Sequence, residues 1–317
     1  MHAADSSPKL TFRLARLDDA AAICEVHRSH VSRWYRIVGS EQFDVEYDHL
    51  SVEERWGFGG PWMSPETCAI HLNNLLLMRH LPCVAELDGH IVAEMEMFLG
   101  REGEPYGRNC HIGLLYVHKD YTGTGIGISL IRHARELARE RGCESLTVSA
   151  MPHNEAFYLK CGFSYGDRLV QITTPVRRYP VETSALQPPL SKQSFTWGMH
   201  MVIGRLQSSA YHLFELSDSF ALPAFASVDK RTAFLSVSGH PSMITWTSGS
   251  IEEATVYAWS SGANARDLAA AAMKLLEPAG ITSANLLLAK DDYESLSGEI
   301  DATLVGTRAT LIYPLQG

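Results

Sequence analysis

The feature that most constrains the fold is a glycine-rich loop between a predicted strand and a predicted helix. The loop, Thr122–Gly127, has three glycines and follows the strand-like segment Asn109–His118. After it, apolar residues recur at helical spacing from Ile126 to Ala138, and Gly142 ends the predicted helix. Glycines let a backbone approach a ligand closely, and the free N–H groups of a first helical turn carry partial positive charge. The sequence therefore predicts an anion site here, suited to a phosphate or pyrophosphate.

Glycine-rich loops also serve as plain tight turns, so the neighbouring segments must decide between the two roles. A Walker A loop needs the triplet Gly-Lys-Ser/Thr, which the sequence does not contain. A dinucleotide fingerprint needs Gly-x-Gly-x-x-Gly after the first strand of a βαβ unit, whereas residues 123–127 are Gly-Thr-Gly-Ile-Gly. The preceding segments 83–87 and 90–97 instead predict an antiparallel hairpin, because they flank Asp88 and Gly89, a pair typical of turns with positive φ angles.

The other predicted elements of the first half alternate between strands and helices. An alternating strand at residues 10–15 precedes a helix that begins after Asp18 and Asp19. A second helix is predicted from Thr67 to Arg79, and Ser145–Ala150 is a strand that follows the glycine loop's helix. These elements predict an α+β domain with a mostly antiparallel sheet.

Two motifs in this arrangement resemble the GCN5-related N-acetyltransferases. The first is the strand Ile112–His118 with the loop Thr122–Gly127 and its helix. The second, Asn154–Phe163, resembles the family's Asn-x-x-Ala…Tyr-x-Lys-x-Gly-Phe end motif. The resemblance covers about residues 10–175. The family usually has Arg or Gln where this chain has Thr122, so one side chain near the pyrophosphate loop is missing while the backbone donors remain.

The resemblance implies acetyl-CoA as donor and co-substrate, and no metal. In the family the pyrophosphate lies on the loop amides, and the pantetheine arm pairs like an extra strand beside the end of the preceding strand. A backbone N–H near Leu115 or Tyr116 then donates to the thioester carbonyl. The implied cofactor-binding residues are Leu115, Tyr116, Val117, Thr122, Gly123, Thr124, Gly125, Ile126, Gly127 and Asn154.

Acetyl transfer to an amine also needs a base, because the amine is protonated at neutral pH, and it benefits from an acid. His111 shares a strand face with Leu115, occupies the place where several family members carry a catalytic glutamate, and has a suitable ordinary pKa. Glu96 and Glu94, on one face of the neighbouring strand, are rival bases. Tyr158 aligns with the family's general-acid tyrosine. Each residue also has a non-catalytic interpretation. His111 is then a partly exposed strand histidine, Glu94 and Glu96 form a solvated strand face, and Tyr158 is a packed aromatic ring.

Six cysteines lie in the first half and form no Cys-x-x-Cys pair, so free thiols are expected. Cys110 is next to His111, but neighbours on a strand face opposite sides, which favours direct transfer over an acyl-enzyme. Residues 1–8 lack the apolar core of a signal peptide, and no apolar segment approaches the roughly 18–20 residues of a membrane span. We expect a cytoplasmic protein.

The second half carries no such motif, but its predicted elements repeat the order of the first. Three strands are followed by a helix, a strand and a last strand, at residues 233–237, 243–246, 254–259, 268–276, 283–288 and 310–313. This order predicts a divergent second acetyltransferase-like domain; an unrelated fold is the alternative. The strand-to-helix junction Ser260–Arg266 has one glycine, and no Tyr…Gly-Phe end follows, so we expect a structural or acceptor-shaping role there.

Four prolines in 15 residues, from Pro175 to Pro189, separate the two halves and predict an extended linker. The expected domains are residues 1–178 and residues 193–317, joined by a proline-rich linker at 179–192. The chain has 317 residues, which is enough for two domains.

Charge and composition bear on which partners the protein can bind. The net charge of −9 argues against nonspecific nucleic-acid binding, which needs a basic surface. The acidic and aromatic segment Glu41–Trp62 falls where the family's acceptor loop lies. It either holds a cationic amine through carboxylates and aromatic rings or is a solvated acidic loop.

Taken together, the sequence predicts an α+β, three-layer fold with a mixed, mostly antiparallel sheet flanked by helices, used in tandem. The predicted function is an acetyl-CoA-dependent N-acetyltransferase acting by direct attack of a small-molecule or peptide amine. No nucleic-acid or membrane partner is expected, and a homodimer is compatible with the sequence. The alternative is a non-catalytic acyl-CoA sensor or interaction protein on the same scaffold. Thr122 supports this alternative, because the family usually has Arg or Gln at that position.

Overall fold

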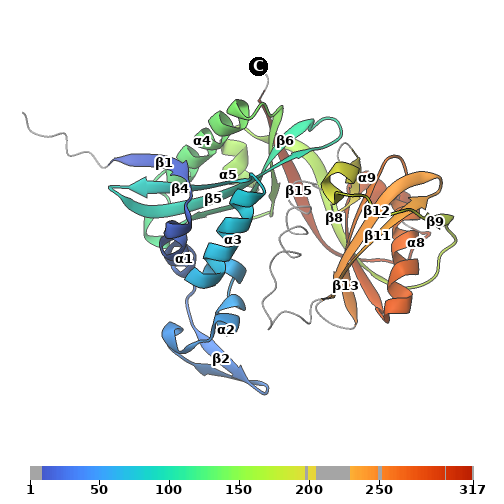
Figure 1. Ribbon diagram of the computed structural model, residues 1–317, viewed down its shortest axis with the longest axis horizontal. Coiled ribbons are helices and arrows are strands. Elements are labelled where there is room, and N and C mark those ends of the chain that lie inside the picture. Colours follow the sequence, from blue (N-terminus) through green and yellow to red (C-terminus); the bar gives the residue numbers. More distant parts are fainter. Residues whose placement is uncertain (1–8, 197–198, 205–228, 249–251, 297, 316–317) are drawn as a thin grey trace, which may run out of the picture. The chain divides into compact units, whose positions relative to one another are not determined.

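The computed structural model of the protein describes residues 9–196, 199–204, 229–248, 252–296 and 298–315, and these form two compact units. Unit 1 contains residues 9–99 and 112–140, and unit 2 contains residues 100–111 and the described residues from 141 onward (Figure 1). The predicted linker, 179–192, lies within unit 2, and the predicted domain boundaries stay a prediction. Residues 1–8, on which the signal-peptide argument depends, lie outside the described residues.

Unit 1 combines an antiparallel sheet with helices. The sheet has the order β1-β4-β5-β6, and a separate hairpin, β2-β3, projects from the segment after α1. The strands are β1 Leu10–Leu14, β2 Tyr35–Val38, β3 Glu41–Asp44, β4 Leu81–Leu87, β5 His90–Arg101 and β6 Arg108–Val117, the first residues of which belong to unit 2. The helices are η1 Leu17–Asp19, α1 Ala20–Arg28, η2 Tyr47–His49, α2 Val52–Trp56, η3 Gly60–Met63, α3 Pro65–Leu77, η4 Lys119–Tyr121 and α4 Ile126–Glu140.

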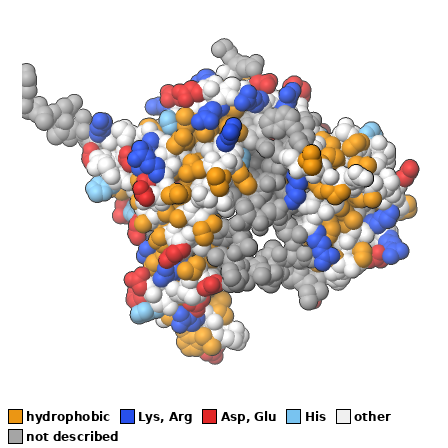
Figure 2. All heavy atoms as spheres, viewed as in Figure 1, with side chains coloured by type: hydrophobic (Ala, Val, Ile, Leu, Met, Phe, Trp, Pro, Cys, Tyr) orange, Lys and Arg blue, Asp and Glu red, His pale blue; other side chains and the backbone are white. Residues whose placement is uncertain are grey.

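Helices cover both faces of this sheet. On one face α1 and α3 pack with β4 around Ile23, Leu72 and Val84, all fully buried. On the other, Phe12 of β1 stacks on His133 of α4, with ring centroids 5.3 Å apart. The β2-β3 hairpin contributes to neither face. It exposes Ile37, Val38 and Phe43, and Figure 2 shows apolar side chains gathered at its tip.

Unit 2 is a longer sheet with the order β7-β15-β8-β14-β10-β13-β12-β11-β9. Its pairs are antiparallel except for β13 with β14, which run parallel, so the sheet is mixed. The strands are β7 Ser145–Ala150, β8 Ser164–Pro175, β9 Thr183–Ala185, β10 His200–Ile203, β11 Asp229–Val237, β12 His240–Ser248, β13 Glu253–Ser260, β14 Ser283–Ala289 and β15 Thr303–Pro314. The helices are α5 Glu155–Lys160, α6 Lys192–Thr196, α8 Ala265–Leu276, η6 Glu277–Ala279 and α9 Lys290–Leu296.

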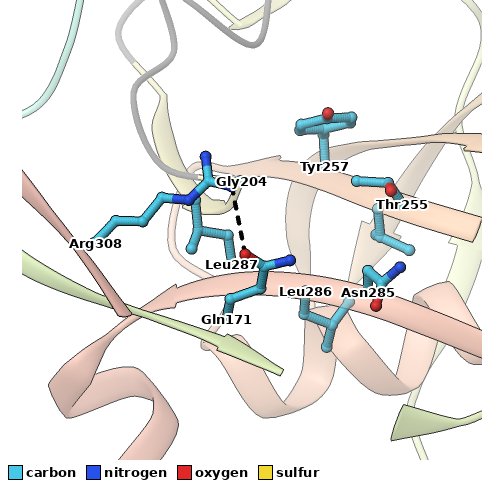
Figure 3. A pocket seen from close by; sticks show the side chains of 9 residues that line it. Gln171, Gly204, Thr255, Tyr257, Asn285, Leu286, Leu287 and Arg308 are labelled. Carbon is cyan, nitrogen blue, oxygen red and sulfur yellow. Dashed lines mark hydrogen bonds between the residues drawn. The ribbon is translucent and has the colours of Figure 1, made fainter. Parts of the chain in front are cut away.

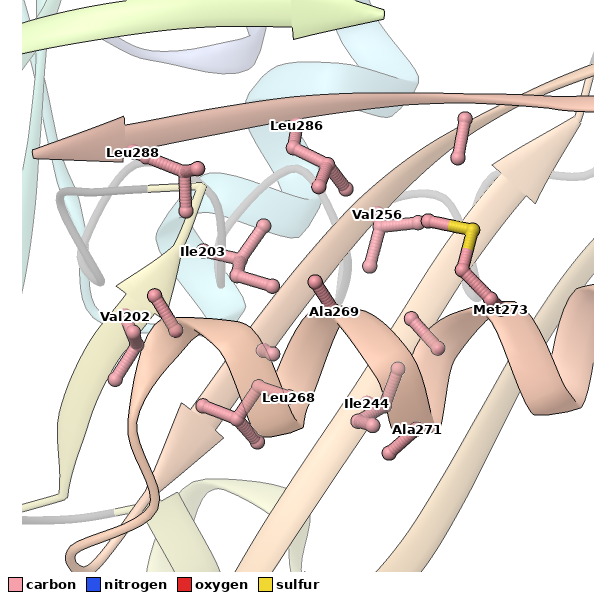
Figure 4. Packing of buried hydrophobic residues seen from close by; sticks show 14 of the residues in the cluster. Val202, Ile203, Ile244, Val256, Leu268, Ala269, Ala271, Met273, Leu286 and Leu288 are labelled. Atoms are coloured by element: carbon pink, nitrogen blue, oxygen red, sulfur yellow. The ribbon is translucent and has the colours of Figure 1, made fainter. Parts of the chain in front are cut away.

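Alternating residues of β13 and β14 form the main core of unit 2 against α8 (Figure 4). Val256, Leu286 and Leu288 point toward this helix, and Leu268 and Met273 pack on them from its buried face. Short alanine side chains on α8 let the helix lie close to the sheet. The intervening strand residues face the opposite side of the sheet.

The last strand, β15, lies between β7 and β8. Leu311 of β15 is opposite Val148 of β7 and opposite Tyr165 of β8, and it is fully buried. The sequence predicts a strand at residues 310–313. In the structure this strand begins earlier, at Thr303, because its first half also pairs, with β8 alone. Neither β8 nor β10 is predicted, since the first lies among charged and proline-rich residues and the second has only four.

The predicted α+β class with a mixed sheet and flanking helices is confirmed. The hairpin at Asp88 and Gly89 also forms, with φ angles of 51° and 84°. The helix over residues 126–140 and the strand over 145–150 have the expected bounds. All six cysteines are buried free thiols, as predicted.

Replacing Leu311 by alanine is expected to lower the free energy of unfolding by about 2–5 kcal/mol, because it leaves a cavity in a fully buried row. Leu304, on the same strand and 56% exposed, is the matched control, and its alanine variant should change stability by less than about 0.5 kcal/mol. Urea unfolding of both variants measures the difference. Equal losses would contradict the burial of β15 between β7 and β8.

Candidate active site

The glycine loop presents backbone N–H groups to open space. Gly123 and Gly125 have φ angles of 78° and 91°, and a Cβ added at either would meet no atom within 4 Å. The N–H groups of Gly123, Gly125 and Gly127 donate no hydrogen bond to any backbone acceptor within the described residues. Because α4 begins at Ile126, its positive end adds to these donors. Unpaired amides at a helix start are what an anion site requires, and the site itself stays a prediction.

The two threonines of the loop shape it and leave its amides free. The hydroxyl of Thr122 donates to the carbonyl oxygen of Lys119 at 2.8 Å, and the hydroxyl of Thr124 donates to that of Tyr121 at 2.6 Å. Both hydroxyls therefore close the turn η4. Thr122 supplies no positive charge of the kind that the family's arginine would bring, so anion binding here depends on the backbone.

The end of β6 holds the other predicted cofactor residues. Leu115 and Val117 are half-buried, and Tyr116 is 40% exposed. The carbonyl oxygen of Val117 already contacts His30 Nε2 at 2.8 Å. The ring of Tyr116 lies on the ring of His27, with centroids 4.5 Å apart.

Behind Tyr116 lies a buried carboxylate paired with a histidine. Glu94 is fully buried, and its Oε2 is 2.5 Å from His27 Nε2. Its other oxygen, Oε1, has no hydrogen-bond partner among the described residues. The His27 ring is held between Trp62 and Tyr116, at centroid distances of 5.2 and 4.5 Å. This arrangement fixes the imidazole between two aromatic faces and a carboxylate.

Glu96 forms a second pair two residues further along β5. Its Oε1 accepts a hydrogen bond from Trp62 Nε1 at 2.8 Å and contacts His71 Nε2 at 2.7 Å. Glu96 is 1% exposed, so the alternative that Glu94 and Glu96 form a solvated acidic face is wrong. Trp62 contacts both pairs, since its ring stacks on His27 while its N–H binds Glu96.

Burial and charge shift the pKa values of Glu94, His27 and His71. Burial raises the pKa of Glu94 well above its usual value, and the charge of Glu96 raises it further. Burial lowers the pKa of His27 to about 4. Burial acts against the charged form of His71 too, but Glu96 outweighs it through charge and hydrogen bonding, and the pKa of His71 is raised. The cluster thus combines a histidine whose charged form Glu96 favours with a carboxyl group, Glu94, whose protonated form burial favours.

Sequence reasoning identified Glu94 and Glu96 but missed His27, His71 and Trp62. These three come from α1, α3 and the segment between them, 25 to 67 residues away from their carboxylate partners. Their spacing within each helix is ordinary, and only the packing of both helices on β5 brings them together. No local signal in the sequence marks them.

Two groups of the predicted cation-binding segment, the Tyr47 ring and the Glu54 carboxylate, already have cationic partners. The Tyr47 ring has the guanidinium of Arg28 at 3.4 Å and that of Arg55 at 4.1 Å, and its hydroxyl donates to the carbonyl oxygen of Met63. Glu54 binds Arg36 and the backbone of Ser51. Neither Tyr47 nor Glu54 is therefore free to receive a cationic amine in this arrangement.

His111 is buried in unit 2 and is neutral. Its Nδ1 lies 3.0 Å from the Thr147 hydroxyl, and it is 1% exposed. Burial lowers its pKa to about 3, far from the value near 7 that motivated its prediction as a base. Thr147 also donates to Asn109 Oδ1 at 3.0 Å, so His111 belongs to a buried polar network.

Tyr158 and Asn154 lie on α5 and at its start. Tyr158 is 6% exposed and packs edge-on against Phe157 and Phe163. Burial raises its pKa to about 12, so its hydroxyl keeps its proton. Asn154 has a buried side-chain oxygen with no partner among the described residues, an acceptor that a ligand N–H could satisfy.

The corresponding junction in the second half differs from the glycine loop. The hydroxyl oxygen of Ser260 accepts hydrogen bonds from the N–H groups of Gly262 and Ala263, and Asn264 Oδ1 accepts one from Asp267. The adjoining cleft, about 480 Å³, is lined by Asp291 and Asp292 among other residues. Its amides are therefore occupied, and its acidic lining repels anions.

A strand also fills the gap beside this junction. β13 and β14 pair only through Glu253–Thr255 and Ser283–Asn285, and beyond that point β10 lies between them. Met201 of β10 is opposite Trp259 of β13, and Ile203 is opposite Leu288 of β14. The N–H of Gly204 then donates to the carbonyl oxygen of Leu287 at 2.8 Å.

Residues 44–163 match the model of the acetyltransferase (GNAT) family. The matched segment contains the glycine loop, α4 and α5. Two rice proteins (Oryza sativa subsp. japonica) are similar to it. Glucosamine 6-phosphate N-acetyltransferase 1 is 33% identical over 87 residues, 26% of this chain and 53% of that protein. "Probable glucosamine 6-phosphate N-acetyltransferase 2" is 33% identical over 57 residues, 18% of this chain and 34% of that protein. The chain thus spans about half or less of the curated relatives it matches.

Solved structures of this fold extend over both halves of the chain. A GCN5-related N-acetyltransferase from Anabaena variabilis superposes with a TM-score of 0.57 at 10% identity, covering 97% of this chain and 73% of that one. A tandem GNAT protein from the clavulanic acid biosynthesis pathway superposes with a TM-score of 0.52 at 13% identity, covering 98% and 99%. The GNAT fold is therefore confirmed, and a tandem GNAT protein matches it over almost the whole chain.

Within the part of the chain that the structure describes, no helix is both long and apolar enough to cross a membrane.

The buried histidines predict how stability depends on pH. Because the folded pKa of His111 is about 3 and the unfolded value is about 6.5, the unfolded chain binds more protons below pH 6.5. Stability present above pH 6.5 is then lost as the pH falls, by about 1.4 kcal/mol per pH unit for each such histidine. His111→Gln should reduce this slope by that amount between pH 6.5 and 5, as measured by urea unfolding.

The exposed His90 provides the control, and His90→Gln should leave the slope unchanged. An unchanged slope in His111→Gln would contradict the buried, neutral state of His111.

Proposed function

We propose that this protein is an acetyl-CoA-dependent N-acetyltransferase whose first half binds the cofactor. The observation that carries the proposal is the loop Thr122–Gly127, which has unpaired backbone N–H groups at the start of α4, within the segment that matches the GNAT family model. The names of the two rice relatives, both N-acetyltransferases, agree with it. The acceptor is an amine, from a small molecule or a peptide.

The residues present suit acetyl-CoA in two ways. The N–H groups of Gly123, Gly125 and Gly127 would hold the pyrophosphate, because they are free donors at a positive helix end. The unpartnered side-chain oxygen of Asn154 would accept a hydrogen bond from an N–H of the bound cofactor. Leu115, Tyr116 and Val117 would border the arm that carries the acetyl group. When bound, acetyl-CoA supplies the thioester carbonyl that the amine attacks.

We assign the base to Glu94 acting through His27. In the deprotonated pair, His27 Nδ1 accepts a proton from the incoming amine while His27 Nε2–H passes its proton to Glu94 Oε2, 2.5 Å away. The proton thus ends on a carboxyl group whose pKa is raised by burial and by Glu96. The stacked rings of Trp62 and Tyr116 hold His27 in place. Glu96 positions His71 and Trp62 beside this pair.

The freed amine then forms the new N–C bond, the C–S bond breaks, and the leaving sulfur takes up a proton. Tyr158 is the proposed donor, since its raised pKa keeps the hydroxyl protonated until a thiolate forms. His111, with a pKa lowered to about 3, is a poorer base than Glu94, and its role is to order the core around Thr147.

The second half is proposed to be a degenerate copy that binds no cofactor. In the family the pantetheine arm would pair between the two diverging strands, and in this half β10 already lies between β13 and β14. Ser260 and Asn264 occupy the amides where the pyrophosphate would bind. One acetyl-CoA is therefore expected for each chain.

Calorimetric titration with acetyl-CoA should give one site per chain, and CoA release should follow on adding some member of a panel of sugar, polyamine and peptide amines.

Gly125→Val should weaken acetyl-CoA binding by ~10-fold or more, because its φ of 91° disfavours a branched side chain next to the free amides. Gly89→Val, at a turn with φ of 84° in the β4-β5 hairpin, controls for backbone strain alone. Binding without turnover of any amine would favour an acyl-CoA sensor, and two sites per chain would contradict the closed second half.

Glu94→Gln should lower kcat by ~10²–10⁴-fold while changing acetyl-CoA affinity little, because the amide keeps the contact with His27 but accepts no proton. In the unmodified protein kcat should rise with pH as Glu94 loses its proton, and this limb should disappear in the variant. Glu86→Gln, a half-buried carboxylate that pairs with Arg13 on the neighbouring strand, is the matched control. An unaltered pH profile in Glu94→Gln would exclude Glu94 as the base.

A further inference from the structure

A small polar pocket lies in unit 2, on the face of the sheet opposite α8. It encloses about 140 Å³ and is bordered by side chains from four strands (Figure 3). Gln171 comes from β8, Tyr257 from β13, Asn285 from β14 and Arg308 from β15. These residues alternate with the apolar ones that face α8, so the pocket is separate from the main core. None of them takes part in the proposed acetyl transfer.

Two of the lining residues, Leu287 and Gln171, belong to a row of the sheet that ends in a glycine. Leu287 of β14, Gln171 of β8 and Gly306 of β15 lie opposite one another across three strands. A Cβ added at Gly306 would meet no atom within 4 Å, so this end of the row is open. Arg308 follows two residues later on the same face, and its long side chain reaches the hollow.

Arg308 brings a positive charge that no acid in the described structure neutralises. Within the described residues, no carboxylate lies within 4 Å of its guanidinium, whereas Arg13, Arg33 and Arg266 each pair with one. Arg308 Nη2 donates a long hydrogen bond to Gln171 Oε1 at 3.4 Å. A guanidinium carries five N–H donors in a planar fork, so most of its donors are available to a ligand.

Tyr257 supplies a second donor beside this charge. Burial raises the pKa of Tyr257, and the nearby charge of Arg308 lowers it in part, so the hydroxyl is protonated at neutral pH. Gly204 packs against the ring, since a Cβ there would lie 2.5 Å from Tyr257 Cδ1, and this contact holds the ring in place. Asn285 is already committed, because it donates to Glu253 and accepts from Thr173.

We propose that this pocket binds a compact oxyanion, a carboxylate or phosphate group, between the guanidinium of Arg308 and the hydroxyl of Tyr257. The Arg308 guanidinium and the Tyr257 hydroxyl are hydrogen-bond donors, and Arg308 carries a positive charge without a carboxylate partner among the described residues. A cation is therefore excluded, and an apolar ligand is disfavoured. The pocket is small, with about 140 Å³ accessible to the centres of water-sized molecules, which suits a compact anion. The proposal does not depend on the acetyltransferase activity.

The test is calorimetric titration of the full chain with inorganic phosphate and, separately, with acetate, at an ionic strength held constant with chloride. Arg308→Gln should weaken binding of the preferred anion by ~10-fold or more, because a charge-assisted hydrogen bond is lost. Tyr257→Phe, which keeps the ring, should weaken it by ~3-fold or more. Arg308→Lys keeps the charge without the fork and should fall between the unmodified protein and Arg308→Gln.

Arg177→Gln is the control, since this arginine is 64% exposed and lies 3.6 Å from Asp301. It should bind both anions as the unmodified protein does, including any anion held by the glycine loop. The preferred anion decides between a carboxylate and a phosphate ligand. The proposal is overturned if neither anion binds, or if Arg308→Gln and Tyr257→Phe both bind like the control while their circular dichroism spectra are unchanged.

Discussion

The backbone groups of diverging strands must find partners, and this requirement organises unit 2. Where two strands separate inside a sheet, their inner N–H and C=O groups would remain buried without hydrogen bonds. Between β7 and β8 the chain meets this requirement with β15, and between β13 and β14 with β10. Both inserted strands come from segments distant in sequence from at least one partner. The sheet is therefore complete only when the two halves of the chain cooperate.

The same requirement explains how, under the proposed function, one fold could hold a cofactor in one half and not in the other. A gap between strands can accept either a ligand or a segment of chain, because both offer extended backbone-like donors and acceptors. In the second half β10 supplies them, while Ser260 and Asn264 supply the oxygens that an anion would bring to the start of α8. In the first half the amides of Gly123 and Gly125 have no such substitute. The proposed loss of a ligand site in the second half would therefore need no change of fold.

Local patterns in the sequence were enough to predict the glycine loop, the helix after it and the Asp88-Gly89 turn. Each of these depends on residues within about one turn of each other, such as glycines at positive φ or an apolar stripe. The His27 and Glu94 pair depends instead on α1 packing against β5, and nothing in either segment alone records it. The exposure of His111 was misjudged for the same reason, because the burial of a strand face is decided by the elements that cover it.

The position of β15 has a consequence for synthesis on the ribosome. β7 and β8 are complete by residue 175, but the strand that joins them begins at Thr303 and ends at Pro314. During translation their facing edges stay unpaired while well over a hundred further residues are added, and unpaired edges invite association with other chains. Truncation near the C-terminus would leave them open permanently. The last dozen described residues therefore protect the first half from aggregation as well as completing the second.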